Sequence, residues 1–262
     1  MEDEIHLRTR PRHAFAEEAY EAGFLMGRLM SLDAWFAALD DESRSEEAEP
    51  TTGDEVFAGP LSRVQARLYE MVFQRLVDQY LTYLAHILAL LFRTRPETLH
   101  APLDEGRRAD SGIALETILQ HETMEELLDT IVDRRVQDLS YRGMADVAKF
   151  LRRRLGFDLF ESHKDLETAV LMVELRNLLA HNRGVVNETF LSRVGSRSPW
   201  KLGARVVLDR DTHENFIGFM ERTAADIDHR AIAKWGLPTI RVQVVEHGFD
   251  EILDEQDEND GG

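Results

Sequence analysis

The sequence predicts an all-α protein, a bundle of about five or six helices. Apolar residues recur at spacings of three and four over long stretches, as they do on the buried face of a helix. No stretch sustains the alternation of apolar and polar residues that is typical of a half-buried strand. Hydrophobic residues make up 43% of the 262 residues, which is enough to form a core.

The N-terminal part is predicted to contain two long helices. Residues 1–13 are polar, and we expect them to be loose. Helical periodicity covers Ala14–Asp40 and then Leu61–Arg93, where Pro96 forces the second helix to end. The acidic stretch between them, residues 40–55, is rich in Ser, Thr and Pro and is predicted to be a linker.

The remaining helices are predicted to be shorter and follow a loop at His100–Gly112. They are, in order, Met124–Leu139, Gly143–Leu155, Asp165–His181 and Asp211–Lys234. A turn-rich break at Gly195–Gly203 and a short extended piece at Lys201–Leu208 separate the last two, and an apolar patch at Ile240–Val245 follows them. The predicted organisation is an N-terminal helix with an acidic linker (1–59), a helical domain (60–245) and a disordered acidic tail (246–262).

The net charge of −18 comes entirely from the two ends of the chain. Residues 1–60 contain 15 acidic and 5 basic side chains, and residues 246–262 contain 8 acidic and no basic ones. Residues 61–245 therefore contain 26 of each sign. Within them, residues 151–205 contain ten basic and six acidic side chains, a net charge of +4 that favours an anionic ligand there.

Several classes of protein are excluded or disfavoured by composition. Without cysteine, the chain has no disulfide, no thiolate chemistry and no cysteine-ligated metal. The N-terminus has no basic and then apolar signal segment, and the longest apolar run, Tyr83–Phe92, is too short to span a membrane. We therefore expect a cytoplasmic protein that does not bind membranes.

The segment Glu174–Asn187 carries the most informative pattern, Glu-Leu-Arg-Asn-Leu-Leu-Ala-His-Asn-Arg-Gly-Val-Val-Asn. The spacing Arg-x4-His alone decides nothing, since it occurs at Arg8–His13, Arg95–His100 and Arg176–His181. Only the third pair combines a predicted amphipathic helix, a polar residue, Asn177, directly after the arginine, and an exit through His-Asn-Arg-Gly.

Helical geometry turns this pattern into a prediction about two chains. Five residues at about 100° each place Arg176 and His181 roughly 140° apart around the helix, so they cannot lie side by side. Two copies of the helix would bring both residue types to one groove, which predicts a homodimer that forms through this helix. A purely structural interpretation is also open: Arg176 pairs with Glu174 or a neighbouring helix, and His181 and Gly184 end the helix.

This segment resembles the signature of HEPN-domain proteins (higher eukaryote and prokaryote nucleotide-binding), in which an arginine, a polar residue that is often asparagine, and a histidine follow one another. The long helix at 61–93, the Leu139–Tyr141 segment with its following helix, and the final helix at 211–234 fit the helical layout expected there. The resemblance covers about residues 60–240, and residues 1–59 lie outside it.

The resemblance implies a metal-independent endoribonuclease that needs no cofactor and acts as a dimer. His181 would be the general acid or base at the ribose 2′-hydroxyl, Arg176 would bind the scissile phosphate, and Asn177 would orient one of them. Attack by the 2′-hydroxyl leaves a cyclic phosphate and requires RNA. Asn182 and Arg183 just after the motif, and Arg152 and Arg153 on the preceding helix, are further candidates for contacts with RNA.

Other candidate sites and functions stay open. Asp209, Asp211, His213 and Glu214 are potential metal ligands, but Asp211 fits better as a residue at a helix N-terminus, so no metal site is predicted. The family context suggests a toxin or a defence effector, with an antitoxin or regulatory protein as a partner. One alternative is a non-catalytic HEPN module that binds RNA, a nucleotide or a protein. Another is a helical regulatory protein whose acidic tail mimics nucleic acid.

Overall fold

The computed structural model describes residues 5–43, 60–100, 115–195, 198–243 and 251–255, and the all-α prediction is confirmed for them. The α-helices are α1 (Arg10–Ser43), α2 (Pro60–Thr94), α3 (Leu115–Leu119), α4 (Met124–Ser140), α5 (Met144–Phe150), α6 (His163–Asn182), α7 (Glu188–Val194) and α8 (Arg210–Trp235). A 3₁₀ helix, η1 (Pro96–His100), follows α2, and a π-helical turn, η2 (Leu151–Leu155), follows α5. The strands are β1 (Ile5–Arg8), β2 (Ile240–Gln243) and β3 (Glu251–Glu255).

All six predicted helices are present, and the two short helices α3 and α7 were not predicted. The expected linker falls mostly on residues 44–59, and most of the expected loop at His100–Gly112 also lies outside the described residues. Among the described helices, none is long and apolar enough to cross a membrane.

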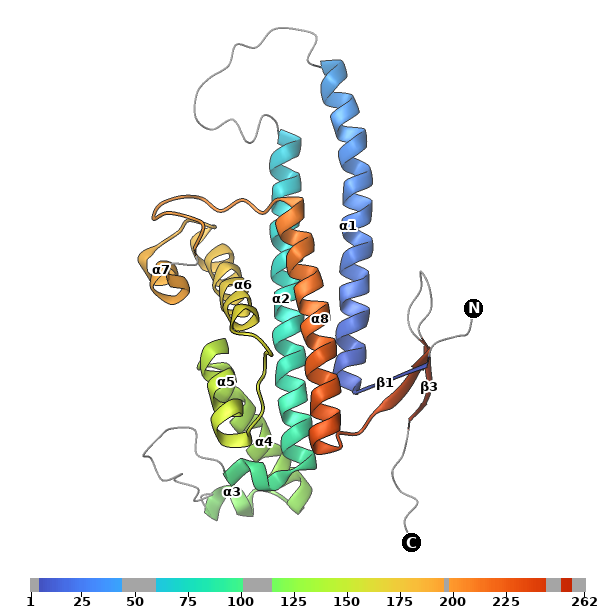
Figure 1. Ribbon diagram of the computed structural model, residues 1–262, viewed down its shortest axis with the longest axis vertical. Coiled ribbons are helices and arrows are strands. Elements are labelled where there is room, and N and C mark those ends of the chain that lie inside the picture. The colour runs from blue at the N-terminus through green and yellow to red at the C-terminus, as the bar shows by residue number, and fades with distance from the viewer. Residues whose placement is uncertain (1–4, 44–59, 101–114, 196–197, 244–250, 256–262) are drawn as a thin grey trace.

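Three long helices, α1, α2 and α8, lie side by side along the long axis of the molecule (Figure 1). Aromatic side chains join them at the centre. The ring of Phe15 on α1 lies 5.6 Å from that of Tyr80 and 5.7 Å from that of Tyr83, both on α2. The Tyr80 hydroxyl is 2.8 Å from that of Thr223 on α8, and the Tyr83 hydroxyl donates to the carbonyl of Ala224 at 2.9 Å. Both buried hydroxyls thus find hydrogen-bond partners on α8, and these bonds fix the axial position of α8 relative to α2.

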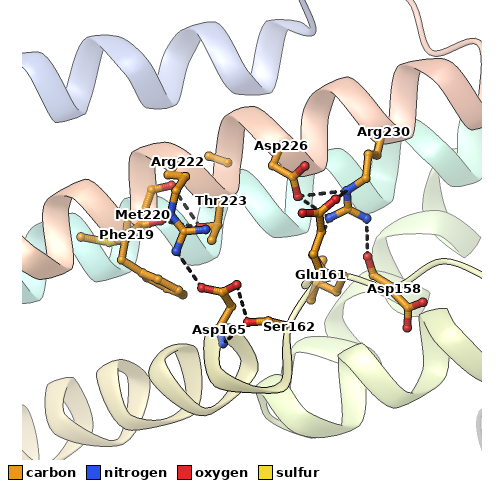
Figure 2. A network of polar contacts seen from close by, with 12 residues as sticks. Asp158, Glu161, Ser162, Asp165, Phe219, Met220, Arg222, Thr223, Asp226 and Arg230 are labelled. Carbon is orange, nitrogen blue, oxygen red and sulfur yellow. Dashed lines mark hydrogen bonds and ion pairs between the residues drawn. The ribbon is translucent and has the colours of Figure 1, made fainter.

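The shorter helices α4 and α6 pack against α2, and α5 packs between them (Figure 1). Basic side chains of α8 hold the segment that leads into α6 (Figure 2). Arg222 donates to Asp165 in the first turn of α6 at 2.7 Å, and Arg230 donates to the carbonyl of Leu159 at 3.2 Å. Ser162 caps α6 by accepting the amide of Asp165 at 3.0 Å. The N-terminal end of α6 is therefore fixed both by its own cap and by α8.

A three-stranded antiparallel sheet, β1–β2–β3, joins segments from both ends of the chain. Ile5 lies opposite Gln243 and Arg8 opposite Ile240. Next to β1, the backbone amide of Thr9 donates to buried Asp228 on α8 at 3.1 Å. Residues 1–13 were expected to be loose and residues 246–262 disordered, so the strands within them differ from those expectations. For β1 the reason is that its partner, β2, lies more than 230 residues away in the sequence, which a local pattern does not reveal. Strand β3 pairs with the nearby β2, but its sequence, Glu-Ile-Leu-Asp-Glu, does not alternate between apolar and polar residues.

Candidate functional site

The motif lies on the last two turns of α6, as the helical periodicity predicts. Leu175, Leu178 and Leu179 are buried and fix the rotation of the helix against the core. Arg176 is 28% exposed and turns toward α2, whereas His181 is exposed on the last turn. The two side chains thus leave the helix in different directions, in agreement with the 140° between them.

The guanidinium of Arg176 is held by groups of its own chain. One terminal nitrogen lies 2.6 Å from a carboxylate oxygen of Asp78 on α2, and the other donates to the side chain of Asn177 at 3.0 Å. The Nε atom is buried and has no hydrogen-bond partner in the described part of the chain. Of the two structural interpretations, the structure shows pairing with a neighbouring helix. Glu174 pairs instead with Arg193 on α7, at 3.1 Å.

The chain leaves α6 through two consecutive residues in the left-handed conformation, Arg183 (φ 53°) and Gly184 (φ 75°). The amide of Gly184 donates to the carbonyl of Leu178 at 3.1 Å, so the cap closes on the last turn. A Cβ atom at position 184 would lie 3.2 Å from a methyl group of Leu179, which explains the glycine. The side chain of Asn182 donates to the carbonyl of Val185 and is therefore occupied within the turn.

A short antiparallel ladder holds the residues after the cap. The amide of Val186 donates to the carbonyl of Ala204 at 2.9 Å, and that of Val206 donates to the carbonyl of Gly184 at 2.8 Å. Val185 and Arg205 face each other between these bonds. The extended piece predicted at Lys201–Leu208 supplies the second side of this ladder. The exit of the motif helix is therefore fixed on one backbone edge by this ladder and on the other by Asn182, whose carbonyl accepts a hydrogen bond from the amide of Val185 at 3.0 Å.

Arg152 and Arg153 lie away from this exit. They are on η2, which leads to the N-terminal end of α6, whereas His181 is at the C-terminal end. The 18 steps from His163 to His181 along the helix correspond to a length of about 27 Å. Arg152 pairs with Asp158 at 3.2 Å. The structure therefore does not bring these two arginines together with the motif residues, and their contact with RNA stays a prediction.

The potential metal ligands at the start of α8 have structural roles. Asp209 caps the helix by accepting the amide of Thr212 at 2.8 Å, and hydrogen bonds from Thr212 lower the pKa of the Asp209 carboxyl. Asp211 lies in the first turn, as predicted, and His213 is buried between aromatic rings. In the described ranges, no three His, Asp or Glu side chains are grouped so that they could hold a metal ion.

Two exposed basic residues next to the motif exit, Lys201 and Arg205, were not singled out from the sequence. A signal for them was present, because residues 175–208 contain six Arg or Lys and a single acidic residue, Glu188. What the sequence could not show is that the ladder brings Arg205 opposite Val185, next to the end of α6.

Comparison with known proteins gives no family assignment. No family model, no curated protein and no solved structure matches this chain. The function must therefore be argued from the residues and their geometry.

Proposed function

We propose that this chain is a HEPN-type ribonuclease that acts as a homodimer and cleaves RNA by attack of the 2′-hydroxyl. The observation that carries the proposal is the exposed position of His181 at a hydrogen-bonded helix end, on the same helix as Arg176 and beside exposed cations that have no carboxylate partner among the described residues. An exposed imidazole there is accessible to a substrate, and the nearby positive charge favours a polyanion. The resemblance of the segment to the HEPN signature supports the same reaction.

In the proposed reaction, the imidazole of His181 removes the proton from a ribose 2′-hydroxyl. The 2′-oxygen then attacks the adjacent phosphorus, and the bond from phosphorus to the 5′-oxygen breaks. A water molecule donates a proton to that leaving oxygen, and the protonated His181 gives its proton to the hydroxide that remains. The products are a 2′,3′-cyclic phosphate and a 5′-hydroxyl end. Arg176 stabilises the negative charge that develops on the phosphate oxygens.

The pairing of Arg176 with Asp78 places a condition on this mechanism. A phosphate must either replace Asp78 or share the guanidinium with it, since the two anions compete for the same donors. Replacing Asp78 by asparagine keeps the shape and removes the charge. If Arg176 acts on phosphate, we expect Asp78→Asn to bind RNA more tightly, by about threefold to tenfold, which corresponds to roughly 1 kcal/mol. Fluorescence anisotropy with labelled RNA measures this, and Asp133→Asn, at an exposed position on α4, is the matched control.

The test of catalysis uses labelled RNA in EDTA. We expect the wild type to cleave it and to leave cyclic phosphate ends, and Arg176→Ala and His181→Ala to lose cleavage. Arg134→Ala and His229→Ala, at exposed positions of α4 and α8, should cleave like the wild type. The absence of cleavage by the wild type, or full cleavage by either motif variant, would contradict the proposal.

A mixing experiment tests the shared site. If each active site takes Arg176 from one subunit and His181 from the other, the two inactive variants complement each other. An equal mixture should recover about a quarter of the wild-type activity, because half of the dimers contain one intact site of two. An inactive mixture, formed under conditions in which subunits exchange, would rule out a site shared in this way.

The second candidate is a non-catalytic HEPN module that binds RNA, a nucleotide or a protein. It is favoured by the engagement of both terminal nitrogens of Arg176 within the chain, one by Asp78 and the other by Asn177. Binding of RNA without cleavage would support this candidate. Tight binding to a protein partner with no affinity for RNA would instead support a regulatory protein.

A further inference from the structure

We propose that the ladder after the motif, which we call the exit hairpin (residues 183–186 and 201–206), binds the phosphate backbone of single-stranded RNA through Arg183, Lys201 and Arg205. The inference rests on the proposed function, because it identifies the surface that holds the substrate beside His181. It adds Lys201 and Arg205 to the candidate RNA-binding residues, and it gives the hydrogen-bonded backbone of the exit hairpin a role in holding them.

The first argument is the distribution of paired and unpaired cations. Of the six basic residues in 175–208, Arg176 and Arg193 are paired with Asp78 and Glu174. Arg183, Lys201 and Arg205 are exposed, and none of them has a carboxylate partner among the residues that the structure describes.

Elsewhere on the described surface, many arginines are neutralised by carboxylates. Arg75, Arg93 and Arg222, for example, lie 2.7 to 3.0 Å from an acidic side chain. In a chain with a net charge of −18, three neighbouring cations that have no carboxylate partner within the described ranges leave a local site for an external anion.

The second argument is geometric. Val185 and Arg205 form a pair that is not directly hydrogen-bonded, flanked by the bonds of residues 184, 186, 204 and 206. Such residues have their Cβ atoms about 5 Å apart on one face of the ladder. The tight turn before Arg205 is closed by the amide of Ala204, which donates to the carbonyl of Lys201 at 3.0 Å. The hydrogen-bonded backbone therefore fixes the positions of the Cα atoms of these residues, so binding an anion costs little backbone conformational entropy.

The third argument concerns the kind of anion. Exposed apolar side chains accompany the cations, with Val185 at 38% and Leu202 at 58% exposure. Single-stranded nucleic acid presents both phosphates and the faces of unstacked bases, and thus suits a surface of this mixed character. His181 lies one turn before this surface, so a strand bound here passes the residue proposed to act on the 2′-hydroxyl.

The test is the salt dependence of binding to a probe that cannot be cleaved. We would use a fluorescein-labelled single-stranded RNA of 2′-O-methyl nucleotides, which has no 2′-hydroxyl to attack, and measure anisotropy at several salt concentrations. The double variant Lys201→Gln/Arg205→Gln should lose about 1.4 from the slope of log affinity against log salt, since each phosphate contact contributes roughly 0.7. Its affinity at low salt should fall on the order of tenfold.

The matched control is Lys149→Gln/Arg134→Gln, which removes the same two charges from exposed positions on α5 and α4. It should keep the wild-type slope, and thermal unfolding of both double variants should match the wild type. Equal slopes in the two double variants, or no binding of the probe by the wild type, would overturn the exit hairpin as an RNA site. Equally tight binding of polyglutamate, lost in the same variant, would indicate an acidic protein partner instead.

These results are separable from the fate of the proposed function. If the slope falls in Lys201→Gln/Arg205→Gln but the wild type does not cleave ordinary RNA, the exit hairpin is supported as an RNA site and the ribonuclease proposal is wrong. If the wild type cleaves ordinary RNA but the slope is unchanged in the double variant, the ribonuclease proposal is supported and the exit hairpin is not an RNA site.

Discussion

At the scale of single residues, His213 is an ionisable side chain enclosed by apolar neighbours. It is 1% exposed, and its ring lies 5.8 Å from that of Tyr69 and 6.4 Å from that of Phe73. Neither ring nitrogen has a hydrogen-bond partner within the described residues. Burial lowers the pKa of His213 to about 4, while the carboxylate of Glu214 opposes this weakly. The folded protein therefore holds this histidine neutral.

The low pKa makes the stability depend on pH in a predictable direction. Below its unfolded pKa of about 6.5, the unfolded state binds a proton that the folded state does not, so stability falls as the pH drops from about 6.5 to about 4. We expect His213→Phe to remove this loss, about 2 kcal/mol between pH 7.5 and pH 4.5. Urea unfolding at the two pH values measures it.

The control for this prediction is His229→Phe, at an exposed position of the same helix. The carboxyl of Asp228, whose pKa is raised mainly by burial, contributes with the opposite sign. It is present in every variant, so it cancels in the comparison. If the wild type and His213→Phe lost the same free energy of unfolding on acidification, the conclusion that His213 is neutral in the folded protein would be wrong.

At the scale of elements, the end of α6 combines a strained cap with a charged side chain. Arg183 has φ 53°, a conformation that favours glycine, and in the described residues it is the one residue other than glycine with positive φ. We expect Arg183→Gly to raise the free energy of unfolding by about 1 kcal/mol and, at the same time, to weaken RNA binding. Urea unfolding and anisotropy on the same samples measure the two effects. Arg183→Ala separates them, because it removes the charge without relieving the backbone.

The elements also show how far the sequence alone could be interpreted. The long helices were predictable because each buries an apolar stripe over many turns, as α2 does with Leu76, Tyr80 and Tyr83. Helix α7 was not, because seven residues give too short a pattern, and only the Asn187 cap marks its start. Strand β1 was not predictable, since Ile5–Arg8 forms a strand by pairing with Ile240–Gln243, which is distant in the sequence.

The candidate site divides in the same way. Helical spacing predicted that Arg176 and His181 diverge, and the charge pattern indicated a basic region. The partner of Arg176 could not be predicted from the sequence, because only the packing of α6 against α2 brings Asp78 next to Arg176. The same holds for Arg205, which a ladder brings next to the helix end.

At the scale of the whole molecule, α1 is part of the central packing even though the sequence suggested a boundary near residue 59. Its Phe15 is 2% exposed and contacts Tyr80 and Tyr83 on α2. We therefore expect a fragment of residues 60–245 to lose cooperative thermal unfolding, because those tyrosines would face water. In the full chain, Phe15→Ala should cost about 3 kcal/mol. Phe24→Ala, at a site that is 55% exposed, should cost far less. A fragment that unfolds cooperatively would support the boundary at residue 59.

The sheet has a consequence for the order in which the molecule can be completed. Strand β1 leaves the ribosome among the first residues of this sequence, but its partner β2 is made more than 230 residues later. Closing so long a loop is entropically unfavourable until the helices between the strands have packed and brought their ends together. During synthesis, Ile5–Arg8 therefore has no partner until Ile240–Gln243 has been made, so this pairing is among the last contacts that can form.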